Sequence, residues 1–203
     1  MLVVHTNKEQ YNGEKNMEKI DIGKNGFVYP MPVALLGTKI EDKANFMALG
    51  WVMRASIDPP LLTVSVNKSH MTNRSIRENK TFSVNFPSIN LIEATDYCGL
   101  VSGKTSDKSD LFKIYYGNLK TAPMIEECPL SLECKLTDIY EMPTSDLFIG
   151  EIVSTYTEER YLTENKPDIK KINPAVLTMP DNNYWSVGEN IGKAWNIGKN
   201  LKR

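Results

Sequence analysis

Two segments in the second half of the chain alternate between apolar and polar residues, which is the period of a strand with one buried face. They run from Leu130 to Tyr140 and from Leu147 to Thr157, and the turn-forming residues 143–146 separate them. We therefore expect a long antiparallel hairpin. Further apolar or β-branched runs predict strands at 27–38, 45–55 with a bend at Gly50, 61–66, 81–86 and 174–178.

Helix signals lie between these strands. Thr72 precedes the polar segment 73–80 and is a suitable N-cap, because a threonine hydroxyl can accept hydrogen bonds from the first turn. A second short helix is expected over 91–97, where Ile92 and Thr95 share a face with Cys98.

Near the end of the chain, Val187, Ile191 and Trp195 recur every four residues and predict the start of an amphipathic helix. Strands therefore extend over most of the chain, with helices inserted between them. This order favours a mainly β fold with appended α-helices, a β-barrel rather than a doubly wound parallel sheet.

Composition supports one globular domain. The 203 residues are 41% hydrophobic and 24% charged, with a net charge of −1, so no overall field favours nucleic acid or an anionic membrane. Residues 1–18 are polar and aperiodic and are expected to be an N-terminal arm, which leaves 19–203 as the domain. No apolar run is long enough to span a membrane and no signal-peptide pattern is visible, so we expect a cytoplasmic protein.

Several classes of catalytic site are excluded. The two histidines, His5 and His70, are too few for a His-rich metal site, and no nucleophile elbow, Rossmann or P-loop motif occurs. Three cysteines without metal-ligand spacing suggest reduced thiols, and the spacing of Cys128 and Cys134 does not decide whether they meet. An enzyme with this sequence would therefore take its chemistry from a cofactor.

Thr72 and Lys108 are candidates for holding an anion. A helix start at Thr72 would present free N–H groups, with Asn67 and His70 just before it, but every helix begins in this way. Lys108 follows a Ser- and Gly-containing loop and offers a cation for a phosphate or a ring carbonyl, or is simply a solvated lysine.

Two aromatic positions allow both a ligand role and a packing role. Trp51 could form the flat wall of a site for a planar ring, or could be a core residue. The same two interpretations apply to Tyr184 and its neighbour Trp185.

In their order and spacing, these segments resemble the flavin reductase-like, FMN-binding split β-barrel family, and within it the flavoredoxin branch. The resemblance covers residues 27–198. It is carried by Asn45-Phe46-Met47-Ala48-x-x-Trp51, Ser56-Ile57-Asp58-Pro59-Pro60, Met71-Thr72-x-x-x-Ile76, Phe82-Ser83-Val84-Asn85-Phe86-Pro87, Cys98-Gly99-x-x-Ser102-Gly103, Asp107-Lys108, Phe148-Ile149-Gly150-Glu151-Ile152 and Gly188-Glu189-x-Ile191-Gly192-x-Ala194.

The resemblance implies a homodimeric split barrel that holds FMN noncovalently near the subunit interface. The flavin would pass electrons from NAD(P)H or a reduced redox protein to an acceptor. The matching positions imply a ring site at Asn45, Met47, Ala48, Trp51, Val52 and Met53, a phosphate or ribityl site at Asn67, His70 and Thr72, and further flavin contacts from Lys108 and Tyr184.

Two departures weaken the implied chemistry. Ala48 stands where a threonine is often found, and Ser145 lies close to where some relatives have a histidine. Two further interpretations therefore remain open. One is an FMN-binding electron carrier or sensor without NAD(P)H turnover, and the other is a split barrel without flavin that serves in protein interactions.

Overall fold

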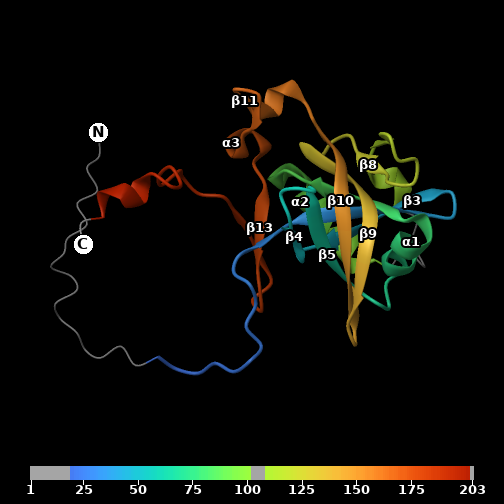
Figure 1. The fold of residues 1–203 in the computed structure, drawn as a ribbon, viewed down its shortest axis with the longest axis horizontal. Coiled ribbons are helices and arrows are strands. Elements are labelled where there is room, and N and C mark those ends of the chain that lie inside the picture. Colours follow the sequence, from blue (N-terminus) through green and yellow to red (C-terminus); the bar gives the residue numbers. More distant parts are fainter. Residues whose placement is uncertain (1–18, 102–107, 202–203) are drawn as a thin grey trace.

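A seven-stranded antiparallel sheet in the order β3-β2-β6-β9-β10-β5-β4 forms the body of the protein. The computed structural model describes residues 19–101 and 108–201, and Figure 1 shows the sheet curled around its core. The strands of this sheet are β2 Ala34–Ile40, β3 Lys43–Leu49, β4 Val52–Arg54, β5 Leu61–Asn67, β6 Thr81–Phe86, β9 Leu130–Glu141 and β10 Ser145–Thr157.

Smaller elements complete the fold. Strand β1 Met31–Pro32 pairs with β13 Ala175–Thr178, which pairs in turn with β14 Asn183–Ser186. The described α-helices are α1 Met71–Asn79, α2 Ile92–Leu100 and α3 Ile169–Ile172. Two short strand pairs are β7 Ile114–Tyr115 with β8 Met124–Ile125 and β11 Leu162–Thr163 with β12 Lys166–Pro167.

The connection between β3 and β4 explains why the sheet curls. These two strands are the opposite edges of the sheet, yet only Gly50 and Trp51 join them. A flat sheet would hold its edges several strand spacings apart, so the two-residue connection requires a nearly closed cylinder. The predicted split β-barrel is thereby confirmed, as is the break at Gly50.

Both faces of the sheet are covered. Along β2, Ala34 and Leu36 belong to a core that includes Ile76 of α1, whereas Leu35 between them belongs to a second core that includes Cys98 of α2. Successive side chains of a strand point to opposite faces, so α1 and α2 pack on different sides of the sheet. This double burial explains the continuous apolar run in β2.

The predicted long hairpin is confirmed. Strands β9 and β10 pair from Asp146–Glu141 to Thr157–Leu130, with register shifts after Ile149 and Ile152. Strand β6 occupies the predicted range 81–86. The irregular connections and the short strands β7, β8, β11, β12 and β14 were not predicted.

Two helix predictions are wrong. Helix α1 begins at Met71 with His70 as its N-cap, so Thr72 lies inside the helix rather than capping it. Residues 187–195 form no helix, and the only helical turn near the end of the described chain is the 3-10 helix Ile197–Asn200. Gly188 and Gly192 disfavour a helix there, and an amphipathic helix also needs a surface on which to pack its apolar face.

The remaining expectations concern termini and cysteines. The predicted arm 1–18 with His5, and most of the loop before Lys108, lie outside the described residues. Cys98, Cys128 and Cys134 are buried free thiols, as expected for reduced cysteines. Among the described helices, none is long and apolar enough to cross a membrane.

Candidate functional site

A cavity of about 170 Å³ lies where the edge strand β3 meets the start of α1 and the end of α2. Five of the residues predicted from the sequence line it, although they come from three separate parts of the chain. Its walls are formed by Asn45, Met47, His70, Met71, Thr72, Cys98, Gly99, Leu100, Val101 and Lys108.

Lys108 is the buried cation of this cavity, with only 3% of its surface exposed. Its Nζ atom donates hydrogen bonds to the carbonyl oxygens of Phe46 at 3.0 Å and Cys98 at 2.9 Å. No carboxylate among the described residues pairs with it, and burial lowers the pKa of its ammonium group. The interpretation of Lys108 as a solvated loop lysine is therefore wrong.

An ammonium group has three donors, and two of them are used here. The Phe46 carbonyl belongs to an edge strand, and the Cys98 carbonyl lies near the end of α2. Lys108 therefore ties α2 to β3 and, among the described groups, retains one N–H for a ligand in the cavity.

Asn45 and Thr72 also line the cavity, and a hydrogen bond joins them. The Nδ2 atom of Asn45 donates to Oγ1 of Thr72 at 3.2 Å, and both residues are buried. Thr72 is in the first turn of α1, whose N-cap residue His70 makes no side-chain capping hydrogen bond. The first N–H groups of a helix have no partners within it, so this end of α1 offers donors and a partial positive charge.

Ala48 supports the cavity from outside its lining. A Cβ atom built at Gly99 would lie 3.3 Å from the Cβ of Ala48, so α2 approaches β3 closely at this point. The small side chains at both positions allow this approach. Ala48 therefore has a packing role, and the hydroxyl that a threonine would supply is absent.

Trp51, Val52 and Met53 line a different cavity of about 440 Å³. Trp51 is 51% exposed, which contradicts its interpretation as a core residue. The other described residues of the lining, none of them charged, are Gly26, Phe27, Val28, Met31, Pro32, Gly50, Thr63, Ser65 and Leu147. The predicted ring site is therefore divided, with Asn45 and Met47 in one cavity and Trp51 to Met53 in the other.

Asn67 and Tyr184 lie outside both linings. Asn67 accepts a hydrogen bond from the Ser69 backbone at 2.9 Å and so shapes the turn before α1. The Tyr184 hydroxyl donates to Oδ1 of Asp96 on α2 at 2.8 Å. Partial burial, together with Asp96, raises the pKa of Tyr184 to about 12.

A buried ion cluster fixes α1 against β10. Asp146 is 1% exposed and accepts hydrogen bonds from Arg77 at 2.8 Å and Asn73 at 2.9 Å, and Lys68 lies 3.6 Å from its other oxygen. Burial opposes ionisation, but these donors hold the pKa of the Asp146 carboxyl below its usual value. Ser145, the neighbour of Asp146, is also buried and lies opposite Asn67 in the sheet.

Sequence reasoning missed two parts of this region. The end of α2 contributes Cys98 to Val101 to the cavity, and the shared face of Ile92, Thr95 and Cys98 was the signal that could have located it. The Asp146 cluster joins residues more than 60 positions apart, and no local pattern indicates such a contact.

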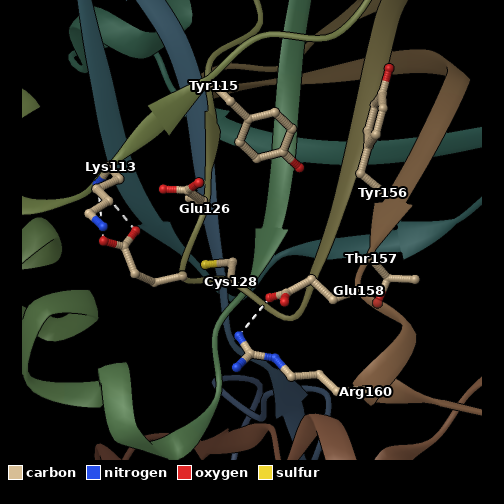
Figure 2. A pocket seen from close by; sticks show the side chains of 9 residues that line it. Lys113, Tyr115, Glu126, Cys128, Tyr156, Thr157, Glu158 and Arg160 are labelled. Carbon is tan, nitrogen blue, oxygen red and sulfur yellow. Dashed lines mark hydrogen bonds and ion pairs between the residues drawn. The ribbon is translucent and has the colours of Figure 1, made fainter.

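A third cavity of about 730 Å³ contains none of the predicted ligand residues. Figure 2 shows Arg160 and Glu158 turned toward each other, where they form an ion pair, and the Lys113 backbone N–H donates to the Glu127 carboxylate. The rings of Tyr115 and Tyr156 meet edge to face at 5.9 Å. Most of its charged groups are therefore engaged within the protein.

Two solved structures that resemble this chain over most of its length are flavoredoxins. The protein from Methanosarcina acetivorans is 58% identical, covers 90% of this chain and 98% of its own, and has a TM-score of 0.88. The protein from Desulfovibrio vulgaris (Miyazaki F) is 34% identical, with coverages of 89% and 100% and a TM-score of 0.83.

A curated relative and a family model agree with these structures. An uncharacterized protein of Archaeoglobus fulgidus is 32% identical over 145 residues, which are 70% of this chain and 81% of the relative. The model of the flavin reductase like domain matches residues 26–177. The chain therefore belongs to the flavin reductase-like family.

Proposed function

We propose that this protein is a homodimeric flavoprotein that binds FMN noncovalently and transfers electrons through it. The observation that carries this proposal is the cavity in which Asn45, Thr72 and the buried Lys108 converge beside the uncapped start of α1. Similarity to two flavoredoxins over about nine tenths of the chain supports it.

The donors around the cavity fit part of an FMN molecule. The N–H groups at the start of α1 suit a phosphate or a ribityl hydroxyl, and the Lys108 ammonium suits a phosphate or a ring carbonyl oxygen. The buried hydroxyl of Thr72 already accepts from Asn45, so its own proton is available to a ligand oxygen.

The size of the cavity is consistent with a site that a second copy completes. Pockets that enclose drug-sized ligands measure about 300–1,000 Å³, whereas this cavity measures about 170 Å³. The flat ring would therefore extend beyond it toward the open cavity at Trp51, where an indole offers an apolar face. A second copy covering this region is consistent with the proposed homodimer.

Bound FMN would supply the redox chemistry, since it accepts and donates one or two electrons. The chain itself would orient the ring, stabilise negative charge near Lys108 and exclude part of the solvent. No carboxylate is among the described residues that line the cavity, and their titratable side chains are those of His70, Cys98 and Lys108.

We propose NAD(P)H or a reduced redox protein as the electron donor. The alternative is an electron carrier without NAD(P)H turnover, and it is favoured by the names of the two flavoredoxins. Anaerobic mixing of the FMN-loaded protein with NADH and then NADPH separates the two. Rapid bleaching of the flavin absorbance by either nicotinamide supports a reductase, and no bleaching together with rapid reduction by dithionite supports a carrier.

The flavin claim itself is tested by titrating the flavin-free protein with FMN and following the fluorescence of the flavin. Saturable binding of one FMN per chain is expected. A folded protein that binds no FMN would contradict the proposal and favour a split barrel that serves in protein interactions.

A further inference from the structure

The segment 187–201, here called the C-terminal arm, leaves the barrel after β14 with large apolar side chains in solvent. Ile191 and Trp195 are 92% and 95% exposed. The arm is tied to the body near its start, where Lys170 donates to the Gly188 carbonyl at 3.2 Å and pairs with Glu189 at 2.9 Å. Among the described residues, later hydrogen bonds of the arm are local, so this copy does not bury its apolar end.

The arm nevertheless has a defined shape. The backbone N–H groups of Asn196 and Ile197 both donate to the Lys193 carbonyl, at 3.2 and 3.0 Å. Gly192 has φ of +154°, and a Cβ atom there would lie 3.2 Å from Cγ1 of Ile197. Trp195 lies within this compact turn.

Trp195 itself adopts φ of +56°, in the left-handed region that bulky residues rarely occupy. Such a conformation persists where the surroundings require it. Trp195 is almost fully exposed in this copy. The turn closed on the Lys193 carbonyl supplies this backbone conformation and leaves the indole exposed for contact with another molecule.

The cavity at Trp51 is an apolar acceptor of suitable size. It measures about 440 Å³, its described lining contains no charged residue, and its walls include the exposed side chains of Val28 and Met53. Exposed apolar surface of this kind marks interaction sites. One indole, which buries about 150–250 Å² on docking, can pack on the exposed side chains at the mouth of this cavity.

The C-terminal arm and the N-terminal segment that forms part of the acceptor cavity lie on the same side of the barrel (Figure 1). Figure 1 shows β13 and both described chain ends on the same side of the barrel, and the arm runs away from its own body there. Residues 26–28, in the described N-terminal segment, form part of the acceptor cavity. In a twofold dimer joined through this side, each arm meets the other copy, and both contacts form together.

We propose that the two copies of the homodimer exchange their C-terminal arms, so that the Trp195 indole of one copy packs on the exposed side chains of Val28, Trp51 and Met53 at the mouth of this cavity in the other. This inference rests on the proposed homodimer and deepens it. The docked indole would lie beside the flavin site, because only Gly50 separates Trp51 from the strand that contributes Asn45 and Met47.

Cross-linking between two differently tagged copies tests the exchange. One copy carries Lys193→Cys on the arm, the other carries Val28→Cys at the cavity, and co-expressed dimers are purified through both tags before treatment with a short bismaleimide. The three native cysteines are buried and do not compete. Tyr140→Cys, an exposed position near the end of the β9–β10 hairpin, replaces Val28→Cys as the matched control.

A covalent dimer is expected with Val28→Cys and none with Tyr140→Cys. Adding Trp195→Ala to the arm should lower the yield at least fivefold, because the arm then lacks the indole that docks at the cavity. A dimer that binds FMN but forms no arm-to-cavity link overturns the exchange and leaves the proposed function intact. Linking only within one chain, in a variant that carries both Lys193→Cys and Val28→Cys, shows that the arm folds back and also overturns it.

Discussion

Replacement of Lys108 by methionine removes one ammonium group and retains most of the side chain's length. The group donates to two carbonyl oxygens at 3.0 and 2.9 Å and, among the described groups, keeps a third N–H for the cavity. A hydrogen bond to a charged group contributes about 1.5–3 kcal/mol. FMN affinity should therefore fall about 10- to 100-fold in the Lys108→Met variant.

The fold should tolerate this change. The carbonyls of Phe46 and Cys98 lose a donor, at a cost of about 1–3 kcal/mol each, but the variant also removes a buried charge whose desolvation opposes folding. These effects have opposite signs, so the free energy of unfolding should change by about 2 kcal/mol or less. Urea denaturation of the flavin-free protein measures this change.

Fluorescence titration with FMN measures the affinity, and Lys120→Met is the matched control. Lys120 is an exposed lysine whose Nζ donates to one carbonyl, that of Gly117 at 3.0 Å, so its removal should leave the affinity unchanged. A folded Lys108→Met variant whose dissociation constant lies within twofold of the wild type would refute the assigned role.

The lowered pKa of Lys108 gives this prediction a pH dependence. An anionic or carbonyl ligand favours the protonated ammonium, so FMN affinity is highest below the folded-state pKa of Lys108. It should decline as the pH rises through that value, which lies below the usual 10.5. The Lys108→Met variant should lack this step.

Changes at three other positions probe the surroundings of the site. Thr72→Val leaves the buried amide of Asn45 without its acceptor and should weaken FMN binding about five- to tenfold, whereas Thr72→Ser should retain it, as fluorescence titration can measure. Asp146→Asn should lower the free energy of unfolding by about 3 kcal/mol. Because the folded-state pKa of Asp146 is depressed, wild-type stability is lost as the pH falls through that pKa, below about 3.8, and urea titrations at several pH values should show that the variant lacks this loss. The pKa of Tyr184 is raised from 10.0 to about 12. Its hydroxyl therefore contributes to the stability of the fold below pH 10.0, and this contribution is lost as the pH rises toward 12. Thermal melts of Tyr184→Phe should lack that decline.

Much of the barrel was predictable because its strands carry local signals. The alternation along β9 and β10 and the β-branched run of β5 appear directly in the sequence. Closure of the sheet was not visible in this way. It follows from the pairing of β4 with β5 and of β3 with β2, which leaves two consecutive strands at opposite edges.

The site was predictable in part for the same reason. Thr72 and Lys108 were singled out as single residues, and the structure brings both to one cavity. The Thr72 cap was wrong because capping depends on which residue first adopts helical backbone angles, and that residue is Met71. The division between the cavities of Asn45 and Trp51 depends on the turn at Gly50, whose direction the sequence pattern does not specify.

The C-terminal segment shows the limit of periodicity. The spacing of Val187, Ile191 and Trp195 predicted a helix, but the structure shows none there. Apolar spacing indicates only that these side chains are to be buried. It does not indicate the surface against which they pack. An extended arm that docks on another copy would bury the same apolar residues without forming a helix.

Binding of FMN to the flavin-free protein is the most direct test of the proposed function. The purified protein is stripped of flavin, its fold is verified by circular dichroism, and FMN is added while the flavin fluorescence is recorded. Saturation at one FMN per chain, with weakened binding in Lys108→Met and unchanged binding in Lys120→Met, is the predicted result. A correctly folded protein whose added FMN remains fully fluorescent and free in solution would contradict it.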